Sequence, residues 1–352
     1  MTDTHLPPLP SAVPLPVVFM QMVNGYWISQ AIFVAAKLGI ADLLEAGPQR
    51  YEEIAAATGA DARSIYRLLR ALASLGIFSE VNEQKFALTP LAQFLRSNAP
   101  GSLRAMAIMS GEEHYRAWGE LLYSVKTGND AFSQVYGLPI FPYLAQNPES
   151  AQIFDQAMTS YSSLEIGAVV ASYDFSALDT LVDVGGGNGS LLTALLQANL
   201  HLKGILFDQE TVVAGATPIL AAGGVSDRCQ VVAGNFFESV PTGGKAYLLK
   251  HIIHDWGDTE AIAILQHCRI AMPAEGRLLL VEMVIQPGND PFIGKLLDLN
   301  MLTMCPGGCE RTEAEYRTLL AQAGFQLTRI VPTSTFASII EAIPLATQIP
   351  PV

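Results

Sequence analysis

Two histidines lie close together in the run Leu249-Lys-His-Ile-Ile-His-Asp-Trp256, where a β-rich stretch gives way to a polar turn. An imidazole there could act as a general base, because its ordinary pKa is near neutrality and it can accept a hydroxyl proton. Spacing alone does not rank His251 and His254, and either could instead cap the following helix. The other histidines lie in terminal or helical contexts that indicate no catalytic role: His5, His114, His201 and His267.

Two glutamates follow at comparable places along the chain. Glu282 ends the next β-rich stretch, and Glu310 is presented by the glycine-rich run Pro306-Gly-Gly-Cys-Glu-Arg-Thr312. Either residue alone is more often a solvated side chain. Together at strand ends they would orient a base and stabilise the imidazolium that it becomes.

A glycine-rich turn, Leu181-Val-Asp-Val-Gly-Gly-Gly-Asn-Gly-Ser190, connects a buried strand to a helix. Glycines let the backbone approach a ligand closely, and the helix N-terminus offers free N–H groups. The spacing is GxGxG rather than the GxGxxG of dinucleotide sites, and Asp183 lies inside the strand end. Both features favour a ligand with a cationic amine over a pyrophosphate, so an NAD-dependent enzyme is the weaker alternative.

Two more strand ends supply groups that a nucleoside needs. Asp208 follows the second strand, at the distance at which a carboxylate binds ribose hydroxyls, although it could instead cap the next helix. Asn235, Phe236 and Phe237 follow the third strand, where a polar group and aromatic rings can hold an adenine. The two phenylalanines could also be ordinary core residues.

These residues all fall in the C-terminal half, where short β-rich runs alternate with helical stretches. Strands are expected at 180–184, 204–207, 230–232, 246–249, 277–284 and 326–330, with an added strand at 337–342. Helices are expected near 190–198, 210–222, 259–272 and 312–323. The alternation predicts a parallel sheet covered on both faces, in which ligands bind at the carboxyl ends of the strands.

The N-terminal part has a different pattern. A Pro-rich arm over residues 1–16 precedes an apolar stretch, 17–40, whose several apolar faces are typical of a helix at a subunit interface. Helices at 51–58 and 62–75, the second capped by Asp61, and a hairpin of 77–81 and 85–88 follow the order of a winged helix. Further helices are expected at 103–109, 112–126, 140–146 and 150–173.

Charge and composition exclude several classes of function. Half of the residues are hydrophobic and 15% are charged, which indicates a sizeable core rather than disorder. The net charge of −13 disfavours nucleic acid as a partner. Residues 1–100 hold seven Lys/Arg against eight Asp/Glu, so a winged-helix transcriptional regulator is also the weaker alternative.

No apolar run reaches the length of a membrane span, and no basic flank of a signal peptide precedes Lys37. These features predict a cytoplasmic protein without a membrane partner. The cysteines form no CxxC pair and have no histidine at zinc-ligand spacing, so free thiols and no metal site are expected: Cys229, Cys268, Cys305 and Cys309.

The motifs, taken in order, resemble the S-adenosylmethionine-dependent small-molecule O-methyltransferases. That family includes plant caffeic acid and flavonoid enzymes and bacterial polyketide and carotenoid enzymes. The resemblance covers roughly residues 17–343 and rests on LGIADLL, RLLRALASLGIF, ALTPLAQFLR, VDVGGGNG, FD, GNFF, LKHIIHDW, VEM and GGCERT. It implies an α/β fold, with a Rossmann-like class I methyltransferase sheet and a winged-helix dimerisation domain that forms a homodimer. The expected domains are 1–100 for dimerisation, 101–175 as a helical linker that contributes to the substrate pocket, and 176–352 for methyl transfer.

The resemblance also implies residue roles. His254 would be the general base on a hydroxyl of a small aromatic or polyketide-like acceptor, with Glu282 and Glu310 around it. S-adenosylmethionine, which leaves as S-adenosylhomocysteine, would be held by Asp183, Gly185, Gly187, Asp208, Asn235, Phe236 and Lys250. The acceptor pocket would be lined by Met158, Trp256, Met301 and Cys305. No metal is implied.

The chain departs from the family pattern at two positions. Asn235 stands where the family usually has Asp, which predicts weakened rather than lost cofactor binding. Cys305 stands where the caffeic acid type has Asn, which argues for a bulky apolar acceptor rather than a monolignol. Some relatives bind the same cofactor but decarboxylate or hydroxylate, and retention of His254, Glu282 and Glu310 favours methyl transfer over that alternative.

Overall fold

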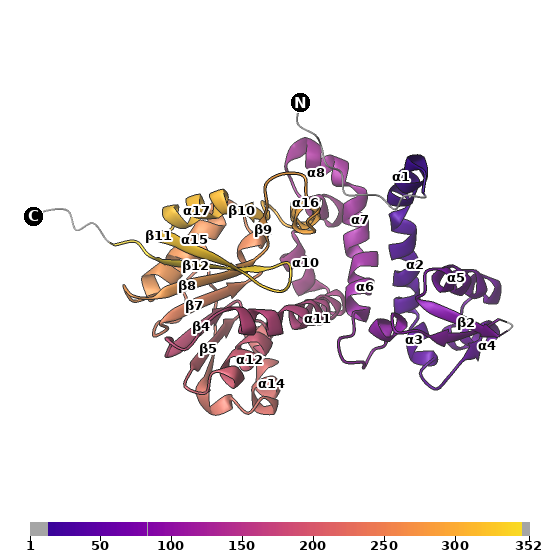
Figure 1. The fold of residues 1–352 in the computed structure, drawn as a ribbon, viewed down its shortest axis with the longest axis horizontal. Coiled ribbons are helices and arrows are strands. Elements are labelled where there is room, and N and C mark those ends of the chain that lie inside the picture. The colour runs from indigo at the N-terminus through magenta and orange to yellow at the C-terminus, as the bar shows by residue number, and fades with distance from the viewer. Residues whose placement is uncertain (1–12, 83, 347–352) are drawn as a thin grey trace, which may run out of the picture. The chain divides into compact units, whose positions relative to one another are not determined.

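A computed structural model describes residues 13–82 and 84–346 of the protein (Figure 1). The first twelve residues of the expected Pro-rich arm lie outside this part of the chain. The chain folds into two compact units. The first comprises Met1–Arg116 with Leu144–Tyr161, and the second comprises Ala117–Tyr143 with Ser162–Val352. The helical segment 101–175 is thus divided between them.

The second unit is built on a seven-stranded sheet of order β11-β12-β8-β7-β4-β5-β6. Its strands are β4 (Thr180–Val184), β5 (Lys203–Asp208), β6 (Cys229–Ala233), β7 (Ala246–Lys250), β8 (Arg277–Glu282), β11 (Phe325–Pro332) and β12 (Ser338–Pro344). The strands β6, β5, β4, β7 and β8 run parallel, and β12 pairs antiparallel with both β8 and β11. The order reverses between β4 and β7, so a ligand crevice is expected at the carboxyl ends of these two strands.

Both faces of the sheet are buried, which explains why the central strands are apolar at nearly every position. Val182, Tyr247 and Leu280 point into the core on one face, whereas Leu181, Leu248 and Leu279 point into the core on the other. The helices of this unit are α8 (Leu121–Thr127), α9 (Ala131–Tyr136), α12 (Ser190–Ala198), α13 (Glu210–Val213), α14 (Ala216–Ala222), α15 (Asp258–Ala271), α16 (Gly294–Met304) and α17 (Glu313–Gln322). The division between the two units falls within α10 (Ile140–Gln146).

A short two-stranded parallel sheet follows β8. One strand was expected over 277–284, but β8 ends at Glu282. Val284–Ile285 form a separate strand, β9, which pairs with β10 (Arg311–Thr312). Val284 lies opposite Arg311 in this pair. The pairing brings the segment that carries Glu310 next to the end of β8, which carries Glu282.

The helix expected over residues 210–222 is broken between α13 and α14. Pro218 has no N–H and would leave a hydrogen bond unmade in the interior of a continuous helix. Because α14 begins at Ala216, Pro218 falls in its first turn, where backbone N–H groups have no helical partner. The proline thus explains the break.

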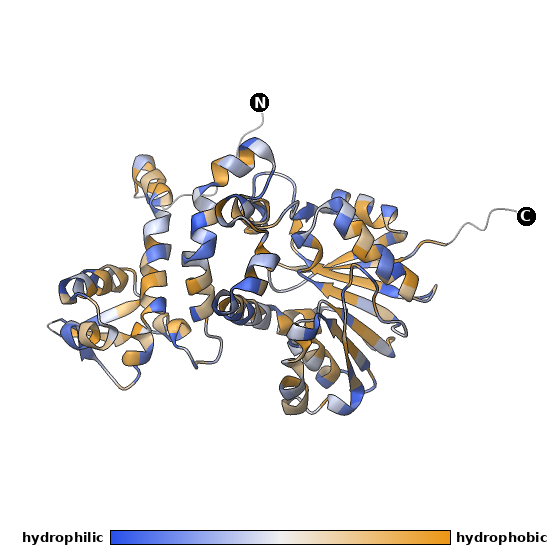
Figure 2. Cartoon of the chain, turned by 180° about the vertical axis from the view of Figure 1, so that it is seen from behind, coloured by the Kyte–Doolittle hydropathy of each residue, from blue (hydrophilic) through white to orange (hydrophobic). Residues whose placement is uncertain are grey.

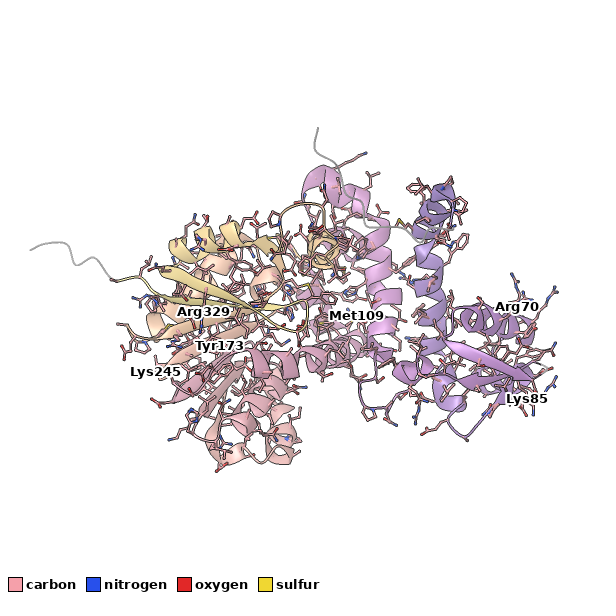
Figure 3. All side chains as sticks on the ribbon, in the orientation of Figure 1. Arg70, Lys85, Met109, Tyr173, Lys245 and Arg329 are labelled. Carbon is pink, nitrogen blue, oxygen red and sulfur yellow. The ribbon has the colours of Figure 1, made fainter. Side chains whose placement is uncertain are left out.

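The end of α11 (Pro148–Ser172) is fixed to the sheet of the second unit. Tyr173 donates its hydroxyl proton to Glu341 of β12, and the guanidinium of Arg329 lies 5.4 Å from the centre of the Tyr173 ring (Figure 3). Arg277 also donates to the Tyr173 hydroxyl, at 3.3 Å. These contacts hold the last turns of α11 in place.

The first unit has the predicted helix, helix, hairpin order. It contains α1 (Leu15–Val23), α2 (Gly25–Lys37), α3 (Ile40–Leu43), β1 (Gln49–Arg50), α4 (Tyr51–Thr58), α5 (Ala62–Ser74), β2 (Phe78–Asn82), β3 (Lys85–Leu88), a short turn of helix at Ala92–Leu95 and α6 (Arg104–Gly111). The strand β1, which the sequence pattern did not predict, pairs with β3. Arg70 lies on α5 (Figure 3), and its guanidinium is 5.5 Å from the centre of the Tyr66 ring.

The stretch expected as one helix over residues 17–40 is bent by 41° where α1 meets α2. Within residues 13–82 and 84–346, no single helix is long and apolar enough to cross a membrane. By length and composition alone, the bent pair of α1 and α2 meets that test when its two helices are taken together.

Replacing Asp61 with alanine is expected to destabilise the first unit by about 1 kcal/mol. The Asp61 carboxylate accepts a hydrogen bond from the Ser64 backbone N–H at 2.8 Å and so caps α5. Chemical denaturation followed by circular dichroism measures the change. Asp61→Asn keeps an acceptor and serves as the control, and equal stability of the alanine variant and the wild type would contradict the capping role.

Candidate active site

The turn after β7 brings two imidazole rings face to face. His251 has a φ of 52°, in the left-handed region that residues other than glycine rarely adopt, and its N–H donates to the Val281 carbonyl at 3.0 Å. A short 3₁₀ turn at Ile253–Asp255 then carries His254. The rings of His251 and His254 stack with their centres 5.2 Å apart and an interplanar angle of 28°.

His254 is held by a carboxylate at each side of its ring. Its Nδ1 lies 2.7 Å from Oε1 of Glu310, and its Nε2 lies 3.5 Å from Oδ1 of Asp255. An ionised carboxylate can only accept a hydrogen bond, so Nδ1 carries a proton and the neutral ring keeps its lone pair on Nε2. The residue is 8% exposed.

Glu282 lies between the two imidazoles and is completely buried. Its Oε1 accepts hydrogen bonds from the N–H groups of Ile252 at 3.2 Å and Ile253 at 2.9 Å. Its Oε2 lies 3.6 Å from Nδ1 of His251 and 3.7 Å from Nδ1 of His254. Burial alone would raise the pKa of Glu282, but the charge of His254, the hydrogen bond and charge of His251 and the hydrogen bond from Ile253 together outweigh burial and lower it.

The acidic surroundings change the basicity of His254. Burial lowers its pKa, but the charges of Glu282 and Asp255 and the hydrogen bond to Glu310 together raise it to about 10. The pKa of His254 thus lies above the near-neutral value expected from the sequence, because Asp255 adds a third carboxylate to the two glutamates that were expected beside the ring. His254 is an imidazolium at neutral pH and becomes a strong base once it loses its proton.

A second carboxylate–histidine pair lies beside the first. Glu165 of α11, which is 3% exposed, places Oε2 2.7 Å from Nε2 of His251 and 3.8 Å from Nζ of Lys250. Burial lowers the pKa of the Lys250 ammonium. Sequence reasoning did not identify Glu165, because it lies inside a long helix with no motif around it.

Arg311 is another residue that the sequence did not single out, although it adjoins Glu310. Its buried guanidinium donates to the carbonyls of Ile253 at 3.1 Å and Trp256 at 2.9 Å, on both sides of His254. It also forms an ion pair with Asp258 at 2.8 Å. The N–H of Glu310 donates to Asp298 at 2.9 Å. These contacts fix the backbone on which the base and its carboxylate partner stand.

The glycine-rich turn after β4 leaves room for a ligand. Gly185 and Gly187 have φ of 70° and 61°; a side chain at Gly185 would collide with Ile252, whereas the space beside Gly187 is open. Asp208 accepts from the N–H of Gly187 at 2.9 Å, which ties the turn to the end of β5.

Asp183 lies beneath this turn, and a side chain at Gly186 would collide with its carboxyl group. Its buried Oδ2 has no hydrogen-bond partner among the described residues, and burial raises the pKa of Asp183 to about 7. Leaving a buried carboxylate oxygen unpaired is costly. The turn therefore combines open backbone with an unsatisfied acidic group, as a site for a zwitterionic ligand would.

Aromatic rings gather around Trp256. Its ring centre lies 6.2 Å from that of Phe236 and 4.7 Å from that of Phe237, and it stacks with Phe141 at 5.9 Å. Trp256, expected to line the acceptor pocket, thus also adjoins the residues expected at the adenine. Asn235 is exposed, and its side-chain oxygen accepts from the N–H of Phe237 at 3.0 Å.

The other residues expected at the acceptor divide between the two units. Met301 and Cys305 are buried in the second unit, where the Cys305 thiol lies 3.7 Å from Oδ1 of Asp255. Met158 belongs to the first unit and is 37% exposed. All four cysteines are free thiols in the structure.

One group of residues has the arrangement of a metal site. A nitrogen from each of His251 and His254 and an oxygen of Glu282 lie within 4.8 Å of one another. The sequence motifs placed these three residues at neighbouring strand ends but implied no metal.

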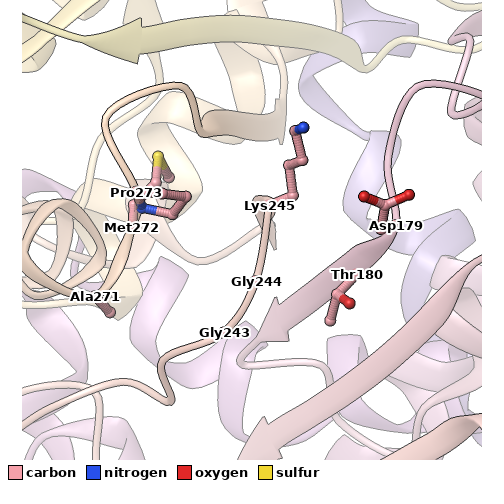
Figure 4. Close-up of a pocket in the computed structure, with 8 residues that line it drawn as sticks. All are labelled: Asp179, Thr180, Gly243, Gly244, Lys245, Ala271, Met272 and Pro273. Atoms are coloured by element: carbon pink, nitrogen blue, oxygen red, sulfur yellow. The ribbon is translucent and has the colours of Figure 1, made fainter.

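A separate hollow opens at the amino ends of β4 and β7 (Figure 4) and is lined by Asp179, Thr180, Gly243, Gly244, Lys245, Ala271, Met272 and Pro273. It lies at the opposite end of these strands from the candidate site.

A sheet of this topology, with a glycine-rich turn at its switch point and a buried imidazole–carboxylate pair beside it, defines a class I methyltransferase. The chain belongs to the O-methyltransferase family and is an S-adenosylmethionine-dependent O-methyltransferase. The family model for the O-methyltransferase domain matches residues 118–326, and that for the O-methyltransferase dimerisation domain matches residues 20–98. The resemblance and the fold class that the sequence predicted are thereby confirmed.

Individual relatives cover nearly the whole chain. Phenazine O-methyltransferase PhzM of Lysobacter antibioticus is 48% identical over 95% of this chain and 98% of its own length. The crystal structure of LaPhzM superposes with a TM-score of 0.91 at 48% identity, covering 95% of this chain and 100% of that one. An O-methyltransferase from neocarzinostatin biosynthesis, solved with S-adenosylmethionine and 2-hydroxy-5-methyl naphthoic acid, has a TM-score of 0.80 at 36% identity, covering 90% and 96%.

Proposed function

We propose that this enzyme methylates a hydroxyl group on a small, planar, fused-ring secondary metabolite of the hydroxyphenazine or hydroxynaphthoate kind, with His254 as the general base. The observation that carries the proposal is the buried hydrogen bond of 2.7 Å between His254 and Glu310, with Glu282 on the same side of the ring. The relatives act in the same chemical range, since one is named for phenazine and another binds a naphthoic acid.

The residues around the glycine-rich turn fit the cofactor. The open backbone at Gly187 admits a ligand, and the unpaired oxygen of Asp183 suits a nearby positive charge. Asp208, at the end of β5, would accept hydrogen bonds from ribose hydroxyls, and Phe236 would cover the adenine. When bound, S-adenosylmethionine supplies a methyl group on a sulfonium, which is a good leaving group.

The chain's own task is to remove the acceptor's proton. The Nε2 lone pair of neutral His254 accepts the hydroxyl proton, and the imidazolium that results is stabilised by Glu310 and Glu282. An amine or ring nitrogen already has an available lone pair and needs no such base before it attacks. The buried base with its carboxylates therefore favours a hydroxyl acceptor.

Replacing Asp208 with alanine is expected to weaken S-adenosylhomocysteine binding about 10- to 100-fold, since hydrogen bonds to a charged group contribute about 1.5–3 kcal/mol. The variant also removes the hydrogen bond of 2.9 Å that the Gly187 N–H donates to the Asp208 carboxylate. Isothermal titration calorimetry measures the change. Asp227→Ala, at an exposed carboxylate, is the matched control, and unchanged binding by the Asp208 variant would contradict its assignment.

The proposed enzyme acts as a homodimer through the first unit. The helices α1 and α2 expose these large apolar side chains: Leu15, Val17, Phe19, Met20, Met22, Val23, Tyr26, Trp27, Ile28 and Val34. In Figure 2, orange on the ribbon marks the hydrophobic residues of the two helices. These residues lie within or next to the segment that matches the dimerisation domain. Exposed apolar surface of this extent is typical of a subunit interface.

Phe19→Asp combined with Trp27→Asp is expected to convert the dimer to a monomer, because two buried charges would replace two aromatic contacts. In the single chain these side chains are 66% and 59% exposed, so their replacement costs the isolated subunit little. Sedimentation velocity measures the mass. A monomeric wild-type protein, or a doubly substituted protein that stays dimeric, would contradict this interface.

A further inference from the structure

We propose that His251, His254 and Glu282 form an inhibitory site for Zn²⁺ or a similar transition-metal ion. The proposal concerns the same pocket as the proposed methyl transfer and rests on His254 being its base. The metal would not take part in catalysis. It would occupy the imidazole that the reaction needs.

The distances between the donor atoms are close to those of a metal site. Oε2 of Glu282 lies 3.6 Å from Nδ1 of His251 and 3.7 Å from Nδ1 of His254. A tetrahedral Zn²⁺ with bonds of about 2.0–2.1 Å holds its ligand atoms about 3.3 Å apart. Each of these two nitrogen–oxygen pairs therefore needs to close by only a few tenths of an ångström. A nitrogen of one imidazole lies within 4.8 Å of a nitrogen of the other.

The third donor is already oriented by the protein. Glu282 uses Oε1 to accept from the N–H groups of Ile252 and Ile253, which fixes the direction of its carboxylate. Its Oε2 is fully buried, has no hydrogen-bond partner among the described residues, and lies nearest to the two imidazoles. An unsatisfied buried carboxylate oxygen between two histidines is a ready ligand for a cation.

The charge around the group also favours a divalent cation. Glu165 lies 2.7 Å from His251, Glu310 lies 2.7 Å from His254, and Asp255 lies 3.5 Å from His254. Lys250 lies 3.8 Å from one of these carboxylates, that of Glu165. Imidazole and carboxylate donors suit zinc, nickel, cobalt and copper, whereas magnesium and calcium prefer sites made of oxygen alone.

Metal binding would disable the base by a specific route. Coordination at Nδ1 of His254 displaces its hydrogen bond to Glu310 and leaves the proton of the neutral ring on Nε2. A ring with a protonated Nε2 cannot accept a hydroxyl proton. Zinc is therefore expected to stop methyl transfer while S-adenosylhomocysteine still binds through the glycine-rich turn.

Calorimetric titration of the full-length protein with zinc chloride tests the site, with cobalt(II) absorption as a second signal of coordination by nitrogen and oxygen. We expect one ion per chain. His251→Asn is expected to weaken zinc binding at least about 10-fold, the size of effect seen on loss of a ligand or its support. The inhibition constant of zinc, measured against each variant's own metal-free rate, is expected to rise by the same factor.

His201→Asn, at an exposed histidine, is the matched control and should bind zinc as the wild type does. Retained binding of S-adenosylhomocysteine shows that His251→Asn is folded, and Glu282→Gln provides a second variant that removes a ligand. Equal zinc affinity of His251→Asn, Glu282→Gln and the wild type would overturn the site. Zinc binding that depends on His251, in a protein that methylates no acceptor, would support the site and count instead against the proposed function.

Discussion

Replacing His254 with alanine is expected to lower kcat about 10²–10⁴-fold, the usual contribution of a general base. The ring is the base of the proposed reaction, and it is 8% exposed with Nδ1 already engaged by Glu310. Its Nε2 is thus the nitrogen left to accept a proton. Steady-state rates with saturating cofactor and a hydroxylated fused-ring acceptor measure the effect.

Cofactor affinity provides the internal control for this variant. Asp183, Asp208 and Phe236, which are proposed to hold S-adenosylmethionine, lie at the ends of other strands, so the dissociation constant of S-adenosylhomocysteine should be close to that of the wild type. His201→Ala replaces an exposed histidine and should retain full activity. A His254→Ala enzyme with near-normal kcat would show that another group removes the proton, and His251 would be the next histidine to replace.

The rate should also depend steeply on pH. The carboxylates around His254 raise its pKa to about 10, so at pH 7 only about one molecule in a thousand has the neutral base. Because the protonated ring is inactive, kcat/KM for the acceptor should rise about tenfold per pH unit as the pH approaches that pKa. The positive charge of the cofactor lowers the pKa of His254 in the complex, so the rise should level off below pH 10 but above the ordinary value of 6.5.

The variant Glu310→Gln distinguishes a pH dependence caused by titration of His254 from one caused by titration of the acceptor hydroxyl. Removing this negative charge lowers the pKa of His254, and the rise in kcat/KM should shift to lower pH with the same acceptor. The maximal rate should also fall, because the ring loses the partner that stabilises its charged form. If kcat/KM of the wild type does not change between pH 6.5 and 10, or if its rise occurs at the same pH in Glu310→Gln, the raised pKa of His254 is not the origin of the pH dependence.

The sheet was predictable from sequence because its strands are buried on both faces and are separated by regular helical stretches. β4 and α12 have the expected bounds, and the other strands of this sheet differ by one or two residues at their ends. The expectation failed where a local residue breaks the pattern, as Pro218 does between α13 and α14. The helices α9 and α16 were missed, because their apolar residues do not recur with a clear helical period.

The site was partly predictable for a related reason. Residues at the carboxyl ends of parallel strands meet at one edge, so the two histidines could be placed near Glu282 and Glu310 from the sequence, but only the family resemblance singled out His254 as the base. Glu165 could not, because no local signal in α11 marks it as a partner of His251. The pKa of His254 could not be predicted either, since it depends on the summed charge of carboxylates from three different segments.

The most direct test of the central claim is methyl transfer itself, with S-adenosylmethionine carrying an isotopically labelled methyl group. Purified enzyme would be incubated with hydroxylated phenazines and hydroxynaphthoates, and the products would be analysed by mass spectrometry and NMR. The proposed function predicts one labelled methyl group on an oxygen of at least one of these acceptors. Transfer to nitrogen, or no transfer to any of them by a protein that binds S-adenosylhomocysteine, would contradict it.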